Sequence, residues 1–234
     1  MLTFRNVSFS YKRNRPVLVN FSIEFKNGRT LLLGPNGSGK STIFALASGI
    51  LKLKSGEIQT DQVVGLLPQA VPIFPNLTVS EQVAYVAWLA MKPMKQAEFD
   101  STKSLEAVHL LDKAKVKPKD LSGGQLRRLG IAGLLNSEAE VMLLDEPTAG
   151  LDIAQSASLF KVLKSLPKEK TIVVCTHQLD GITDFFDYVA VIHNGELKFN
   201  GTIEEFEKIG QKPANQLTTN TLVNAYAAIV ESVI

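Results

Sequence analysis

The run Gly34-Pro35-Asn36-Gly37-Ser38-Gly39-Lys40-Ser41-Thr42 fits the pattern Gly-x-x-x-x-Gly-Lys-[Ser/Thr]. Glycines let the backbone turn tightly, so that successive N–H groups point inward at one anion. Lys40 adds a positive charge for the β- and γ-phosphates of a nucleotide, and Ser41 offers a hydroxyl to a magnesium ion. The pattern therefore predicts a nucleotide-phosphate site formed by residues 34–42. The alternative is a glycine-rich loop that only connects a strand to a helix.

A strand and a helix must position this loop. Residues Thr30 to Leu33 form an apolar run typical of a short buried strand, and residues Ser41 to Leu51 are expected to form a helix. The N-terminus of a helix favours negative charge, because its first N–H groups have no partner within the helix. This strand–loop–helix order favours the phosphate-binding interpretation.

A second group of candidate residues ends the apolar strand Val141–Leu144. Asp145 can hold the magnesium ion, usually through water. Glu146 is placed to orient or deprotonate a water that attacks the γ-phosphate. Two solvated carboxylates at a turn would be the better explanation without the phosphate loop. With that loop upstream, the metal and catalytic roles are favoured.

A third group, Leu121-Ser122-Gly123-Gly124-Gln125, opens another predicted helix that runs to about Asn136. A serine, two glycines and a helix N-terminus can form a second anion site, to which Ser122, Gly123, Gly124 and Gln125 would contribute. An ordinary serine-capped helix is the alternative.

This third group resembles the signature of ATP-binding-cassette (ABC) ATPases, and the resemblance extends from Met1 to about Gly201. It implies a head-to-tail dimer in which each ATP lies between two protomers. It also implies that Tyr11 stacks on adenine, that Gln69 joins Ser41 and Asp145 as a magnesium ligand, and that His177 reaches the γ-phosphate. The expected catalytic residues are Lys40, Glu146 and His177. Ala149-Gly150-Leu151-Asp152 matches the family's D-loop. The signature is followed by Leu126 where the family usually has a polar residue, which should affect packing rather than nucleotide chemistry.

Each of these assignments has a structural alternative. Tyr11 could be a packing residue on a strand face, and Gln69 could be a solvated loop residue. Asp152 could cap the following helix, and both roles of Asp152 can hold together.

The fold class expected is α/β, a P-loop NTPase core with an antiparallel β subdomain and a helical insertion. We expect one ABC ATPase domain over residues 1–234, with a core at 1–75 and 120–205, a helical subdomain at 76–119 and a tail helix at 206–234.

Apolar residues alternate along Leu2–Tyr11 with a local slip. In Val17–Phe25, the odd-numbered apolar residues should share one face. Thr78 or Ser80 should cap a helix that Pro93 ends, and a second helix should run from Gln96 to Leu111.

Composition limits the possible functions. A net charge of +2 over 234 residues argues against a nucleic-acid surface, so no nucleic acid is expected as a partner. The lysines between residues 113 and 119 are best explained as a solvated loop. The single cysteine, Cys175, lies in an apolar run and should be buried and inert. Neither a signal peptide nor an apolar run of transmembrane length is present. The chain is expected in the cytoplasm, peripheral at the inner face of the cell membrane.

The resemblance implies an ATPase that converts ATP and water to ADP and phosphate, with ATP and Mg²⁺ as cofactors. It would drive transmembrane transport through separate permease subunits, as a homodimer or paired cassette. Residues 77–89 resemble those of bacterial exporters, which often end in a short amphipathic helix, so export is the expected direction. The alternative is a soluble ABC ATPase not coupled to transport, either an assembly factor or a nucleic-acid-associated protein. Only about fifty residues separate Gln69 from the signature, without the sustained heptads of a long coiled coil.

Overall fold

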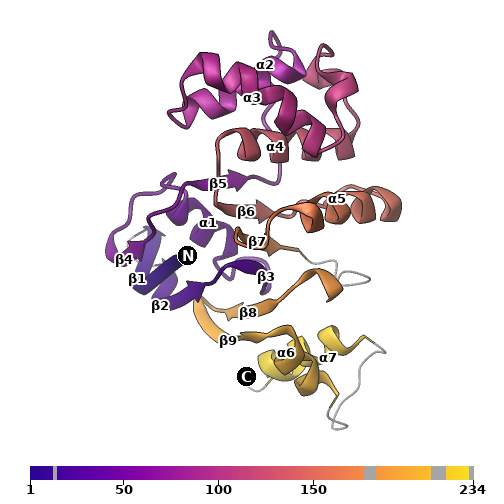
Figure 1. The fold of residues 1–234 in the computed structure, drawn as a ribbon. Coiled ribbons are helices and arrows are strands. Elements are labelled where there is room, and N and C mark those ends of the chain that lie inside the picture. Colours follow the sequence, from indigo (N-terminus) through magenta and orange to yellow (C-terminus); the bar gives the residue numbers. More distant parts are fainter. Residues whose placement is uncertain (13–14, 177–182, 212–219, 232–234) are drawn as a thin grey trace. The chain divides into compact units, whose positions relative to one another are not determined.

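The computed structural model describes residues 1–12, 15–176, 183–211 and 220–231 (Figure 1). The chain divides into two compact units. Unit 1 contains Met1–Asp61 and Lys168–Ile234, and unit 2 contains Gln62–Pro167. Both units combine strands with helices, and the predicted α/β class with an antiparallel β part is confirmed.

Unit 1 begins with an antiparallel sheet. Strand β1 (Leu2–Lys12) lies between β2 (Arg15–Phe25) and β4 (Ser55–Gln59). The apolar residues of β1 that lie in the core are Leu2, Phe4, Val7 and Phe9. The change of phase between Phe4 and Val7 occurs at Asn6, which has a φ of 49°. The predicted alternation with a slip is therefore confirmed.

The prediction for β2 was wrong in its first half. Leu18 is buried, whereas Val19, expected on the face of Phe21, is 44% exposed. Asn20 has a φ of 49°, and the pairing passes from Phe21–Val7 to Leu18–Phe9, so β2 contains one residue more than β1 at this point. A β-bulge of this kind reverses which side chains face the core.

The second part of unit 1 is a sheet in the order β7-β3-β8-β9. Strands β3 (Gly28–Leu33), β7 (Thr171–Cys175) and β8 (Tyr188–His193) are parallel, and β9 (Glu196–Thr202) pairs antiparallel with β8. Every residue of β3 and β7 is buried, so both faces of these strands are covered. Cys175 at the end of β7 is fully buried, which confirms the prediction of a buried thiol.

The helices of unit 1 follow β3 and β9. Helix α1 (Lys40–Ala47) ends four residues before the predicted Leu51, and Gly49 beyond it has a φ of 74°. Helix α6 (Ile203–Gly210) overlaps the start of the tail helix expected at 206–234, and Thr202 and Glu205 form a capping box at its start. Helix α7 (Thr221–Glu231) packs against α6 at Gly210, where a Cβ would lie 2.0 Å from the Thr221 carbonyl oxygen.

Unit 2 pairs β5 (Val64–Leu67) in parallel with β6 (Val141–Asp145). Its helices are α2 (Val79–Leu89), α3 (Met94–Ala107), α4 (Gly123–Asn136) and α5 (Ile153–Ser165). Short 3-10 turns occupy Leu111–Lys113 and Pro118–Asp120 here, and Thr183–Phe185 in unit 1.

The predicted cap of α2 is confirmed, since the Thr78 hydroxyl and Glu81 form a capping box. Pro93 does not end this helix. Helix α2 stops at Leu89, Met91 takes a left-handed φ of 70°, and Pro93 stands at the N-cap of α3. Helix α3 ends at Ala107 rather than Leu111, because the chain turns at His109 with a φ of 56°.

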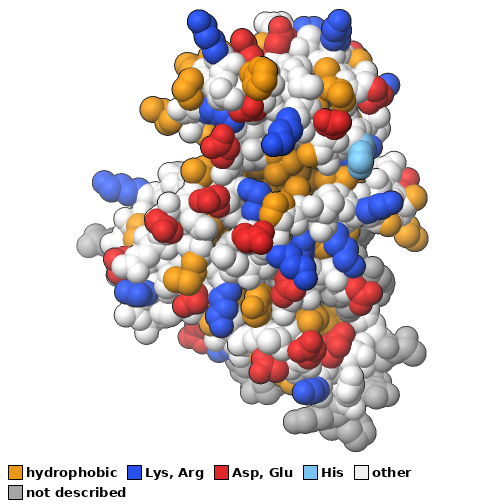
Figure 2. Space-filling view, viewed as in Figure 1, with side chains coloured by type: hydrophobic (Ala, Val, Ile, Leu, Met, Phe, Trp, Pro, Cys, Tyr) orange, Lys and Arg blue, Asp and Glu red, His pale blue; other side chains and the backbone are white. Residues whose placement is uncertain are grey.

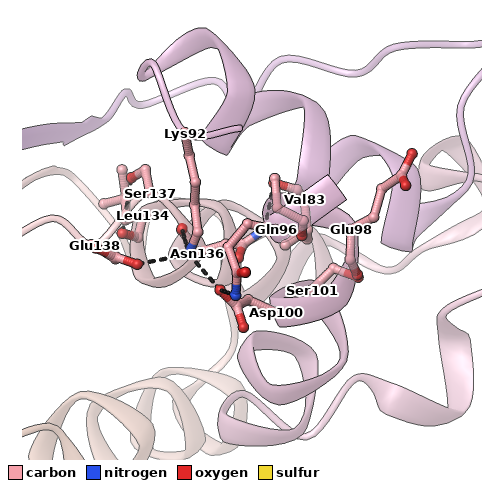
Figure 3. Close-up of polar contacts among 11 residues, drawn as sticks. Val83, Lys92, Gln96, Glu98, Asp100, Ser101, Leu134, Asn136, Ser137 and Glu138 are labelled. Carbon is pink, nitrogen blue, oxygen red and sulfur yellow. Dashed lines mark hydrogen bonds and ion pairs between the residues drawn. The ribbon is translucent and has the colours of Figure 1, made fainter. Parts of the chain in front are cut away.

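One lysine joins three helical segments of unit 2 (Figure 3). The Lys92 ammonium lies 2.7 Å from Asp100 of α3 and 2.8 Å from Glu138, and donates to the Asn136 carbonyl oxygen at 3.0 Å. Its side chain is only 10% exposed. The Asn136 amide group donates to the carbonyl oxygens of Val83 and Ala97. The C-terminal end of α4 is thus attached to both α2 and α3.

The distribution of charge on the surface and the lengths of the helices bear on the kinds of partner that the chain could bind. On the face seen in Figure 2, acidic and basic side chains are interspersed, without a large area of one sign. Within the described ranges of the chain, none of the helices has the length and apolar character needed to cross a membrane.

Candidate nucleotide-binding site

The predicted phosphate loop leaves β3 at Leu33 and enters α1 at Lys40. At Gly34, a Cβ would lie 2.3 Å from the Ile192 carbonyl oxygen, so only glycine fits there. Gly39 has a φ of 108° and passes close to Leu18. These two positions explain why the loop needs glycine at its start and at the helix entry.

The Lys40 side chain closes this loop upon itself. Its ammonium donates to the carbonyl oxygens of Gly34 at 2.7 Å and Pro35 at 3.0 Å, and the residue is 8% exposed. The Ser38 amide also donates to the Pro35 carbonyl oxygen at 3.1 Å. These bonds close the loop, with the Lys40 ammonium held against the carbonyl oxygens at its start.

The loop fits a phosphate group. The Ser38 hydroxyl is buried and has no hydrogen-bond partner among the residues that the structure describes. A buried hydroxyl without a partner is costly, and an anion's oxygen would satisfy it. The space over Gly37 is open, and Ser41 is exposed in the first turn of α1. A ligand therefore has room, a hydroxyl donor and a cation in the same loop.

Tyr11 lies at the end of β1 in the same unit. The residue is 60% exposed, and its ring meets that of Phe9 edge-on at 5.1 Å between ring centroids. Its hydroxyl lies 3.2 Å from the hydroxyl oxygen of Thr42, within hydrogen-bonding distance, and Thr42 follows the loop in α1. Tyr11 is therefore not a core residue, and its exposed face is available for stacking beside the phosphate loop.

The candidate acidic residues leave one edge of the β5–β6 pair. Leu67 pairs with Leu144, so Gln69 and Asp145 follow neighbouring strand ends on the carboxyl edge, where ligands of parallel sheets bind. Asp145 is half-buried and Gln69 is exposed. Glu146 has a φ of 48°, an uncommon conformation for a residue other than glycine, and backbone strain of this kind clusters at functional sites.

The turn after Glu146 leads into the predicted D-loop. The Ala149 amide donates to the Glu146 carbonyl oxygen at 3.0 Å, and the Leu151 amide donates to that of Thr148 at 3.0 Å. Asp152 then caps α5 through a 2.7 Å bond from the Gln155 amide, which confirms the capping interpretation of Asp152.

The signature residues form the start of α4. The Ser122 hydroxyl accepts a hydrogen bond from the backbone N–H of Gln125 at 3.3 Å. In return, the side-chain oxygen of Gln125 accepts one from the backbone N–H of Ser122 at 2.9 Å. The interpretation of Ser122 as the residue that caps α4 is therefore correct. A cleft of about 250 Å³ opens between the N-termini of α4 and α5, and Ser122, Gly124, Arg128 and Asp152 are among its lining residues. The cap and a small open cleft coexist.

Sequence reasoning missed Arg127. Its guanidinium donates to the backbone carbonyl oxygens of Pro68, Gln69 and Ala149, so it joins α4 to two of the candidate loops. Burial lowers the pKa of this guanidinium below its usual value. The only signal in the sequence was an arginine in the second turn of the signature helix. His177, the predicted γ-phosphate contact, lies outside the described residues.

Comparisons with known proteins agree with these motifs. The family described as ABC transporter matches residues 18–149. An energy-coupling factor transporter ATP-binding protein, EcfA, of Methanothermobacter thermautotrophicus is 33% identical, over 86% of this chain and 71% of that protein. The methionine import ATP-binding protein MetN of Carboxydothermus hydrogenoformans is 30% identical, over 96% of this chain and 73% of that protein.

Solved structures are similar as well. A dimeric ATP-binding cassette in a post-hydrolysis state, bound to ADP and Pi, has a TM-score of 0.76 at 26% identity, over 87% of this chain and 99% of that chain. CbiO1 from Clostridium perfringens, part of the ABC transporter complex CbiONQ, has a TM-score of 0.77 at 27% identity, over 91% of this chain and 95% of that chain.

Proposed function

The chain belongs to the ABC transporter family as an ATP-binding and ATP-hydrolysing cassette, and we propose that it drives transport through separate membrane subunits. The observation that carries the proposal is the closed phosphate loop, with the Lys40 ammonium held inside it and a buried hydroxyl at Ser38. A loop of this construction is suited to hold the phosphates of ATP. The chain would work at the cytoplasmic face of the membrane, against its permease.

In this proposal, residues 34–42 hold the phosphates and Tyr11 stacks on the base. Lys40 neutralises charge on the β- and γ-phosphates, and the N–H groups at the start of α1 add partial positive charge. The exposed face of Tyr11 would contact adenine without reading its hydrogen-bonding edge. Base identity would then matter less than the phosphates.

Magnesium fits the chemistry of the proposed ligands. The Ser41 hydroxyl, the Gln69 side-chain oxygen and the Asp145 carboxylate are hard oxygen donors, which Mg²⁺ prefers. Among the described residues, no group of three His, Cys, Asp or Glu side chains could hold a metal alone, so phosphate oxygens and water would complete the coordination. The bound ion would supply charge neutralisation at the phosphates.

Glu146 is the proposed general base. From the end of β6, its carboxylate would orient a water and accept its proton as the water attacks the γ-phosphate. His177 would contact the γ-phosphate. Ser122, Gly123, Gly124 and Gln125 would contact the nucleotide of a second protomer, because we propose that ATP closes a head-to-tail dimer.

Whether the chain drives export or import is the most specific part of the proposal. Residues 77–89 and the short helix α7 favour export. The relative named for methionine import favours the opposite direction. Both directions use the same ATPase chemistry, and the membrane subunit would contain the transported substrate's site.

Purification of the full-length tagged chain from membranes tests the proposal. We expect a multi-span protein to co-purify, and the complex to move that protein's substrate across vesicles only with ATP. The direction of movement distinguishes export from import. Glu146→Gln should bind ATP and stop both hydrolysis and transport, with a loss of about 100- to 10,000-fold in rate. Failure of any multi-span protein to co-purify with the chain would contradict the transport function. Full turnover in Glu146→Gln would contradict the catalytic assignment.

A further inference from the structure

Helix α4 packs closely against β5 at two glycines, and this packing bears on the position of Arg127. A Cβ on Gly130 of α4 would lie 2.2 Å from Leu67 Cδ1, and a Cβ on Gly65 of β5 would lie 2.7 Å from Leu134 Cδ2. Glycine at both positions therefore allows the helix and the strand to approach. Arg127 precedes Gly130 by three residues, so it lies on the same face of α4 and reaches the loop that leaves β5.

The Arg127 side chain contacts backbone atoms of two loops. Its Nη1 donates to the carbonyl oxygens of Gln69 and, at 3.3 Å, of Pro68, while its Nη2 donates to that of Ala149 at 3.4 Å. Pro68 and Gln69 follow β5, whereas Ala149 opens the D-loop after β6. The planar guanidinium, with donors in a fixed fork, can join two separate loops at once.

The next residue makes a different set of contacts. Arg128 Nη1 lies 3.4 Å from the carbonyl oxygens of Val108 and His109, beyond the end of α3. Two adjacent arginines therefore connect α4 to different parts of unit 2. Of the two arginines, Arg127 is the one that contacts the loops that follow β5 and β6.

We propose that Arg127 is a positioning residue, which holds the Gln69 loop and the D-loop in register with the signature helix. The inference rests on the proposed function. There, Gln69 serves the chain's own Mg-ATP, whereas Ser122 serves the partner's ATP. Because one side chain joins both elements, loss of Arg127 should loosen the magnesium ligand and weaken the coupling between the two ATP sites. The phosphate loop, in unit 1, should still bind ATP.

Arg127→Gln and Arg127→Lys test this role in the full-length chain. We measure kcat, KM for ATP, the Mg²⁺ concentration for half-maximal hydrolysis and the Hill coefficient for ATP. In Arg127→Gln, we expect kcat to fall about tenfold, since small displacements of catalytic groups are costly. The half-maximal Mg²⁺ concentration should rise, the Hill coefficient should approach one, and the ATP dissociation constant should stay within about twofold. Lysine keeps the charge but not the fork, so Arg127→Lys should recover only part of kcat.

Lys92→Gln is the matched control, because Lys92 also makes three contacts but binds the opposite end of α4. It should lower the thermal midpoint while leaving the Mg²⁺ dependence and the Hill coefficient unchanged. If the Arg127 variants change only the thermal midpoint, as Lys92→Gln does, Arg127 merely stabilises the fold and the inference is wrong. If Arg127→Gln does not fold, Arg127→Lys replaces it in the test. A raised half-maximal Mg²⁺ concentration in Arg127→Lys would then support the positioning role, and an unchanged one would contradict it. Absent hydrolysis in the wild-type chain would instead contradict the proposed function.

Discussion

Single residues in this chain owe their proposed roles to their surroundings. Tyr11 is the clearest case, since a strand-end tyrosine can belong to the core or to the surface. The structure leaves Tyr11 60% exposed and places its hydroxyl near Thr42, in the helix that follows the phosphate loop. Local contacts therefore orient an exposed aromatic face beside the loop that would hold the phosphates.

Tyr11→Ala should weaken ATP and GTP alike, because stacking uses the face that every base possesses. A base–aromatic stack contributes about 1–3 kcal/mol, or about five- to 150-fold in affinity. Tyr11→Phe keeps the ring and loses only the Thr42 contact, so its affinity should stay within about threefold of wild type. Equilibrium titration with fluorescent nucleotides measures both variants. Unchanged affinity in Tyr11→Ala would show that the ring does not contact the base.

At the scale of elements, α4 is held at both ends of its length. Arg127 joins its second turn to the loops after β5 and β6, and Lys92 joins its last residue, Asn136, to α3 (Figure 3). The ion pair changes both pKa values. The hydrogen bond from Lys92 lowers the pKa of Asp100, with a further contribution from Gln96. Partial burial acts to lower the pKa of Lys92, but Asp100 and Glu138 together raise it above its usual value.

Lys92→Gln should lower the free energy of unfolding at pH 7 by about 1–3 kcal/mol, since hydrogen bonds to a charged group are lost. The Asp100 pKa is depressed, so its contribution is present above the unfolded value of 3.8 and disappears as the pH falls through the folded value. The Lys92 contribution is lost as the pH rises through a folded pKa above 10.5. Urea unfolding should therefore show wild type and Lys92→Gln converging in acid and in strong base. The exposed Lys95→Gln is the control, and a gap independent of pH would contradict the assignment.

At the scale of the whole molecule, the proposed site needs two chains, because a signature and a phosphate loop from different protomers would share one ATP. Ser122→Arg and Lys40→Ala should each abolish hydrolysis alone. Mixed in equal amounts, they should form heterodimers with one intact site, and random pairing would restore about a quarter of wild-type activity. Light scattering verifies that dimers form. Two inactive variants whose mixed dimers remain inactive would contradict the composite site.

The sequence by itself determined the features that depend on neighbouring residues. The phosphate loop, the buried strands β3, β6 and β7, and the caps at Thr78, Ser122 and Asp152 were all predictable, because glycine conformations, apolar runs and capping hydroxyls act within a few positions. The ABC family assignment followed from the order of those motifs.

Tertiary structure decided what depends on distant partners. The bulge at Asn20 exists because β2 must pair with a strand that has its own irregularity at Asn6, so the faces of Val17 and Val19 could not be read from alternation. Arg127 became informative only when folding brought Gln69 and Ala149, 58 and 22 positions away in sequence, to its guanidinium. Such contacts depend on how α4 packs against β5, and no local sequence pattern encodes that packing.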